Sequence, residues 1–89
     1  MLAIRVADRV FTLDADEADG LIRHLERAEP ATAELEAKLR AALESGEPAS
    51  LDPGELAILG VVIESWAMEF GVDADHVQDL REAIADELG

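Results

Sequence analysis

The chain contains no cysteine, and aromatic residues make up only 3% of it. The missing cysteines exclude a disulfide framework, a thiolate zinc site and a cysteine nucleophile. Because aromatic side chains are so few, the core must be built from Leu, Ile, Val and Ala, and we expect no aromatic-lined ligand pocket. Stability is therefore expected to come from the packing of aliphatic side chains.

A long hydrophobic run is also missing. The longest uninterrupted apolar stretch covers residues 56–63, far short of the roughly 18 residues needed to cross a bilayer. Charged Arg5 and Asp8 interrupt the N-terminal segment, which therefore does not have the pattern of a signal peptide. We expect a single domain, residues 1–89, of a cytoplasmic protein.

Basic residues are scarce. The chain has 7 Lys and Arg against 21 Asp and Glu, and residues 46–89 hold 1 basic and 11 acidic residues, a net charge of −10. Such a surface repels the phosphates of nucleic acids and of anionic lipids, so we expect no direct binding to nucleic acid or membranes. It attracts basic proteins. A second interpretation is that the acidity only keeps a small protein soluble and monomeric.

Residues 2–13 alternate between apolar and polar side chains as a β-hairpin does. A turn at residues 8–9 pairs Val6 with Phe11. One face of this hairpin is apolar and contains Leu2, Ile4, Val6, Phe11 and Leu13. Because an isolated hairpin is marginally stable in water, we expect helices to cover this face.

A first pair of helices follows the hairpin. Asp14 is a suitable N-cap for a helix that runs to about Ala28, because its carboxylate can accept a hydrogen bond from a free backbone amide. A second helix begins near Pro30 or Thr32 and ends at Gly46, a residue type favoured just beyond a helix C-terminus. This second helix is expected to bury Leu35, Leu39, Ala42 and Leu43.

The second pair of helices has the strongest start signal in the chain. Residues 52–55 supply an aspartate as N-cap, a proline at the first helical position and a glutamate at the third. This signal favours a helix over a buried strand for the apolar run that follows. Gly71 ends the helix, and a fourth helix begins at Asp73 or Asp75. The fourth helix is expected to bury Val77, Leu80, Ile84 and Leu88.

Together these elements predict a mostly helical α+β fold in which the N-terminal hairpin packs on four helices. Residues 48–51 form a short extended connection that could add a third strand beside residues 11–13. The alternative is a four-helix domain with a frayed N-terminal segment.

The two helix pairs, residues 14–46 and 50–89, resemble each other. At an offset of 38, residues 12–17 align with residues 50–55, and the second helices of the pairs align at an offset of 41. We interpret the pairs as copies from a degenerate internal duplication.

The two copies differ on one side of the third helix. Its core face is expected to contain Leu56, Leu59, Ile63, Trp66 and Phe70. A second apolar stripe contains Ile58, Val61, Ser65 and Met68, whereas the first helix has Gly20, Arg23, Arg27 and Pro30 at these positions. Because an apolar helix face must be covered, the stripe is either internal to the fold or an interface with a partner protein or a second copy. Gly60 would permit close approach in either case.

The sequence contains no catalytic or metal-binding pattern that we can assign. Residues 14–20 carry the acids of a calcium-binding loop, but Leu25 stands where that loop needs a glutamate. Ser65 and the other serines have no nearby histidine in a nucleophile pattern, and His24 is expected to be exposed. His76 lies among acids that could hold a divalent cation weakly. We therefore expect no enzyme activity, no cofactor and no metal site.

Two functional hypotheses follow from the sequence. The first is a small acidic, non-enzymatic adaptor or regulatory domain that binds another protein, with Ile58, Val61, Ser65 and Met68 as the candidate interface and a homodimer as one form of it. The second is an acidic inhibitor or neutraliser of a basic partner, acting as a nucleic-acid mimic or an antitoxin does.

Overall fold

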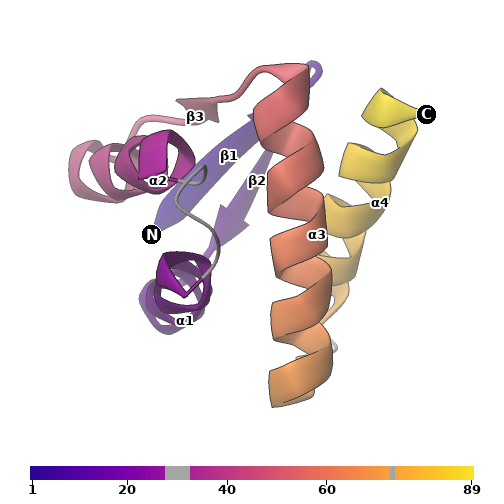
Figure 1. Cartoon of the computed structure of the whole chain (residues 1–89). Coiled ribbons are helices and arrows are strands. Elements are labelled where there is room, and N and C mark those ends of the chain that lie inside the picture. Colours follow the sequence, from indigo (N-terminus) through magenta and orange to yellow (C-terminus); the bar gives the residue numbers. More distant parts are fainter. Residues whose placement is uncertain (28–32, 73) are drawn as a thin grey trace.

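The computed structural model describes residues 1–27, 33–72 and 74–89, and its elements follow the α+β order expected from the sequence (Figure 1). The three strands form one sheet in the order β2-β1-β3. The alternative of a four-helix domain with a frayed N-terminus is therefore wrong. In chain order the elements are β1 Leu2–Val6, β2 Arg9–Leu13, α1 Ala15–Glu26, α2 Ala33–Ser45, β3 Ala49–Ser50, α3 Pro53–Phe70 and α4 Asp75–Leu88.

The hairpin forms with the expected apolar face but with a different register. Val6 pairs with Arg9 and Ile4 pairs with Phe11, so the two-residue turn is residues 7–8 and the predicted turn at residues 8–9 is wrong. The predicted pairs are displaced by two residues along one strand. A displacement of two leaves every side chain on the same face of the sheet, which is why the alternation could not distinguish the two registers.

The third strand lies beside β1, and its predicted place beside residues 11–13 is wrong. Ala49 is aligned with Ile4 in a parallel pairing, so β1 is the central strand. Helix α2 packs against β1, whereas α4 packs against β2 and β1. The chain that leaves α2 at Gly46 therefore meets the open edge of β1 first, since β2 is on the far side.

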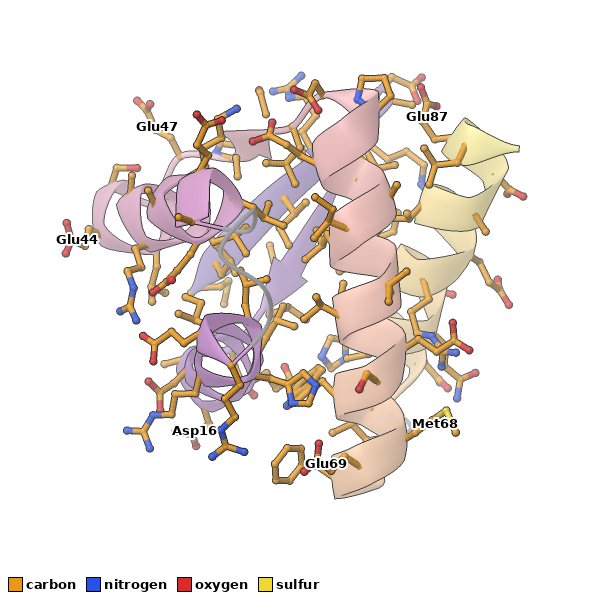
Figure 2. The ribbon with its side chains drawn as sticks, in the orientation of Figure 1. Asp16, Glu44, Glu47, Met68, Glu69 and Glu87 are labelled. Carbon is orange, nitrogen blue, oxygen red and sulfur yellow. The ribbon has the colours of Figure 1, made fainter. Side chains whose placement is uncertain are left out.

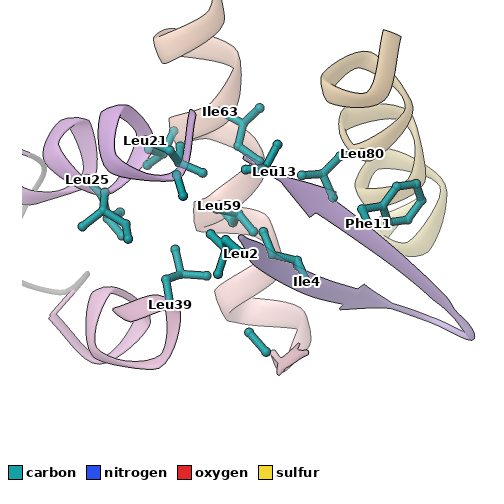
Figure 3. Close-up of a cluster of buried hydrophobic side chains, with 14 of the residues drawn as sticks. Leu2, Ile4, Phe11, Leu13, Leu21, Leu25, Leu39, Leu59, Ile63 and Leu80 are labelled. Atoms are coloured by element: carbon teal, nitrogen blue, oxygen red, sulfur yellow. The ribbon is translucent and has the colours of Figure 1, made fainter. Parts of the chain in front are cut away.

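One hydrophobic cluster joins the sheet to all four helices (Figure 3). The five residues predicted for the apolar face of the hairpin are all buried. They meet the buried side chains of the helices, which include Leu21, Leu25, Leu39, Leu59, Ile63 and Leu80 (Figure 3). Aliphatic residues dominate this core, as the composition requires.

The capping signals predicted at the starts of α1 and α3 are confirmed. The Asp14 carboxylate accepts a hydrogen bond from the Glu17 amide at 2.8 Å, and the Asp52 carboxylate accepts one from the Glu55 amide at 2.7 Å. In each case the glutamate accepts a hydrogen bond from the aspartate amide in return. Both starts are thus capping boxes. The internal duplication that these strings suggested stays a prediction.

Helix ends are confirmed where the structure describes them. Gly71 ends α3 with a φ of 64°, and the Val72 amide donates to the Ala67 carbonyl. Gly46, with a φ of 78°, follows α2 as expected. The predicted boundaries at Ala28, Pro30, Thr32 and Asp73 lie outside the described residues.

Two predicted core residues are exposed instead. Phe70 has 59% of its surface exposed and Leu88 has 45%. Each lies in the last turn of its helix, past the buried residues Trp66 and Ile84 one turn earlier, so the core has ended before the helix does. Gly60 serves an internal contact, because a Cβ at this position would lie 3.1 Å from Ile84 on α4.

The backbone of the turn at residues 7–8 is strained, and a substitution can test this strain. Ala7, the first of the two turn residues, has a φ of 56°. It is the only described residue other than glycine with a positive φ. A left-handed conformation costs an L-residue about 1–2 kcal/mol. Glycine avoids this cost, but part of the gain is offset because glycine loses more conformational freedom on folding. We expect Ala7→Gly to raise the free energy of unfolding by up to about 1 kcal/mol in urea denaturation. The matched change Ala37→Gly in α2 should lower it by about 1 kcal/mol, and a loss in both variants would contradict the turn.

An ion pair between α2 and α3 provides a second prediction. Lys38 Nζ donates to Glu55 Oε1 at 2.6 Å, and this hydrogen bond raises the pKa of Lys38 above its ordinary value of 10.5. The chain has one lysine, no tyrosine and no cysteine. Lys38 is therefore the one residue of these three types, and no other lysine, tyrosine or cysteine titrates at alkaline pH beside it.

Because the folded pKa is raised, the stability from this pair is complete below the unfolded pKa and is lost as the pH rises through the folded value. We expect the urea midpoint of the wild type to fall as the pH rises above about 10.5. The urea midpoint of Lys38→Met should be lower than that of the wild type below about pH 10.5 and should not change as the pH rises above it. The midpoint of Lys38→Arg should be close to that of the wild type and should also not change, because arginine keeps its charge. A fall of equal size in all three proteins would contradict this assignment.

Candidate protein-interaction surface on α3

Helix α3 has one buried face and one exposed face. The apolar residues that it buries are Leu56, Leu59, Val62, Ile63, Trp66 and Ala67. On the opposite face Val61 and Met68 are 70% and 76% exposed, and Ser65 between them is also exposed. Ile58, the fourth residue of the predicted stripe, is partly buried against the core. We call Val61, Ser65 and Met68 the α3 surface.

The neighbours of α3 explain why this face stays open. Helix α1 packs against one side of α3 and α4 against the other, and the sheet lies behind (Figure 1). The remaining side faces outward, and Met68 projects from it away from the sheet (Figure 2). In the part of the chain that the structure describes, no element covers Val61 or Met68.

A groove between α3 and α4 borders the α3 surface. It has a volume of about 470 Å³. Its lining is Ala57, Gly60, Val61, Glu64, Gln78, Arg81, Glu82, Ile84, Ala85 and Leu88. Val61 also lines a shallow hollow with Met68 and another with His24 on the α1 side. Val61 is therefore the residue that joins the groove to the hollows on either side of the α3 surface.

Acidic side chains border the groove and the hollow next to Met68, whereas Arg27 lines the hollow on the α1 side. Glu64 and Glu82 line the groove, and Glu69 lines the hollow next to Met68. Within residues 1–27, 33–72 and 74–89, Glu64 and Glu82 form no ion pair, whereas Glu69 is near His24. Arg81 is the one basic residue of the groove lining. The surface thus combines an apolar centre with a mostly negative rim.

His24 lies between α1 and α3, and its predicted exposure is wrong. Only 15% of its side chain is exposed. Its Nε2 is 3.1 Å from Ser65 Oγ, its Nδ1 is 3.4 Å from Glu69 Oε2, and its ring contacts Phe70 edge-on. The sequence could not show these contacts, because 41 residues separate His24 from Ser65. The one local signal is that His24 precedes Leu25, at the border of the apolar face of α1.

The order carboxylate, imidazole, hydroxyl is also that of a serine nucleophile triad. Acyl transfer needs hydrogen-bond donors placed for the developing oxyanion as well. Ser65 lies inside α3, where the backbone amides donate to carbonyls along the helix, and the 3.4 Å distance to Glu69 is longer than a hydrogen bond. The geometry therefore supports a polar contact that positions α1 against α3.

His76 also forms a contact between elements. Its Nε2 is 2.8 Å from Glu17 Oε1, which links the start of α4 to the start of α1. Among the described residues no group of three metal-ligating side chains is close enough to hold an ion. Nor does any helix in the described part of the chain have the length and apolar character to cross a membrane.

The contact between His24 and Ser65 can be measured by a double-mutant cycle with His24→Ala and Ser65→Ala. We expect a coupling energy of about 0.5–1.5 kcal/mol in urea denaturation, because each side chain is the other's hydrogen-bond partner. The cycle cancels the separate effect of each substitution on helix propensity. A control cycle between Ser65→Ala and His76→Ala should give a coupling close to zero, since no contact joins these residues. A coupling between His24 and Ser65 as small as that of the control cycle would contradict the hydrogen bond between them.

Comparisons with known proteins give no relative for this chain. It matches no protein-family model, no curated protein and no solved structure. Function must therefore be inferred from the residues and geometry of the chain itself.

Proposed function

We propose that the protein is a small non-enzymatic domain that binds another protein through the α3 surface and the adjoining groove. The observation that carries this proposal is the exposure of Val61 and Met68 on the outer face of α3. Few other large apolar side chains are exposed in the described part of the chain, and two of these, Phe70 and Leu88, also belong to α3 and α4. The exposed apolar residues are thus concentrated on one helix pair.

The energy available at this surface is large enough for binding. Burial of a fully exposed Val or Met side chain contributes about 1.5–3 kcal/mol. Two such anchors with the neighbouring groove can therefore supply several kcal/mol, the scale of the residues that dominate protein interfaces. We expect the Glu-rich rim to increase the association rate with basic partners and to favour such partners over others.

The second candidate function, neutralisation of a basic partner, is favoured by a separate observation. Residues 46–89, which include α3 and α4, hold 11 of the 21 acidic residues and 1 of the 7 basic residues. A partner bound by charge alone should dissociate as salt rises, because exposed charges are screened within about 10 Å at 0.1 M salt. A partner bound through the apolar surface should be retained.

Affinity capture tests the proposal. Three tagged baits, the wild type, Val61→Ser/Met68→Ser and Val10→Ser, are incubated with a lysate of the cells that produce the protein, at 0.1 M and at about 0.5 M salt. Val10 is the matched control, an exposed apolar residue on β2. We expect one or more proteins to bind the wild type and Val10→Ser at both salt concentrations. The same proteins should not bind Val61→Ser/Met68→Ser. The same proteins in equal amounts on all three baits would contradict the proposal.

A further inference from the structure

We infer that the partner presents a basic amphipathic helix, which lies along α3 with its apolar side on Val61 and Met68 and its cationic side chains on the acidic rim. This inference rests on the proposed function and specifies the chemistry of the partner. Three features support it: the shape of the apolar surface, the charges at its border, and the poor fit of a second copy of the chain.

The apolar surface is long and narrow, as a docked helix requires. It starts in the groove near Ala57 and Leu88, continues through Val61 and ends at Met68. The distance from residue 57 to residue 68 along α3 is roughly 16 Å at 1.5 Å per residue. A helix of about three turns covers this length and presents apolar residues at positions i, i+4 and i+7. Ala57, Val61 and Met68 stand at i, i+4 and i+11 on α3, and this spacing places them along one side of the helix.

The border favours basic side chains on the partner, because the acidic residues Glu64, Glu69 and Glu82 outnumber the basic residues Arg27 and Arg81. Glu64 lies on α3 between Val61 and Met68, and Glu82 lies across the groove on α4. Neither carboxylate has an ion-pair partner among the described residues. A lysine or arginine on the docked helix would form a charge-assisted hydrogen bond with each of them. An acidic or neutral helix would leave the same carboxylates partly desolvated without a partner, which costs free energy.

A second copy of the chain fits this surface less well. A symmetric dimer must place the same patch on itself. If two α3 helices pair in opposite directions so that Val61 of each copy meets Met68 of the other, the twofold axis passes between residues 64 and 65. The two Glu64 carboxylates are then near each other in an interface between two chains of net charge −14. Like charges of this size oppose association.

A designed peptide tests the inference. The probe is an 18-residue fluorescent peptide with leucines at i, i+4 and i+7 and lysines or alanines elsewhere, and binding is followed by fluorescence anisotropy. One control peptide has the same composition in scrambled order, and another has glutamate in place of lysine. We expect the amphipathic basic peptide to bind at least about tenfold more tightly than either control, a difference of about 1.4 kcal/mol.

Variants of the protein separate the apolar and charged contributions. Val61→Ser/Met68→Ser should weaken peptide binding about tenfold or more at any salt concentration. Glu64→Gln/Glu82→Gln should weaken it about three- to tenfold at low salt and less at high salt. Glu44→Gln, on the opposite side of the molecule (Figure 2), removes one acid away from the surface and should leave the affinity within about twofold.

Each of the following results would overturn the inference. Equal binding of the scrambled peptide would mean attraction by charge alone, and equal binding to the Val61→Ser/Met68→Ser variant would place the peptide elsewhere. A wild-type dimer by light scattering that becomes monomeric in Val61→Glu would make a second copy the occupant. If the peptide does not bind but capture from the lysate still depends on Val61 and Met68, then the inferred chemistry of the partner is wrong and the proposed binding surface is retained. If capture does not depend on them either, the proposed function is wrong.

Discussion

Burial of the hairpin's apolar face against the helices is the interaction on which the rest of the structure depends. Leu2, Ile4 and Leu13 are almost completely buried, and an isolated hairpin of this size would not be stable in water. Helix α2 covers the side of β1, and α4 covers β2, so the sheet determines where the helices lie. Helix α3 packs between α1 and α4. Its inner face completes the core, and its outer face is exposed to solvent.

The exposed surface follows from this arrangement. In the described residues of this 89-residue chain there is one core, and helices α1 to α4 are arranged around one small sheet. The apolar residues of α3 extend around more of the helix than that core can cover, so Val61 and Met68 stay in contact with solvent. The polar contact of His24 with Ser65 closes the border with α1, and Gly60 allows α4 to approach closely on the other side. Between these two borders lies an apolar surface with an acidic rim.

Features encoded by neighbouring residues were predictable from the sequence, and those that depend on distant contacts were not. The N-caps Asp14 and Asp52 and the stop at Gly71 involve residues within a few positions of each other, and all are confirmed. The hairpin register was wrong because a displacement of two preserves the apolar face, so only the strained turn at Ala7 distinguishes the registers. The contact of His24 with α3 needs the packing of two helices that no local pattern specifies. The periodicity identified the apolar stripe of α3, but only the packing could show that Val61 is exposed while Ile58 is partly buried.

The central claim is that the outer face of α3 is open to solvent in the isolated protein. The chain has two methionines, Met68 on this face and Met1 at the exposed terminus, so oxidation by hydrogen peroxide followed by peptide mass spectrometry reports the claim directly. Met68 of the folded protein should be oxidised as fast as Met1 and as fast as in the urea-unfolded chain, at both micromolar and millimolar protein concentrations. Slow oxidation of Met68 that becomes fast only in urea would show that this face is covered and would contradict the account.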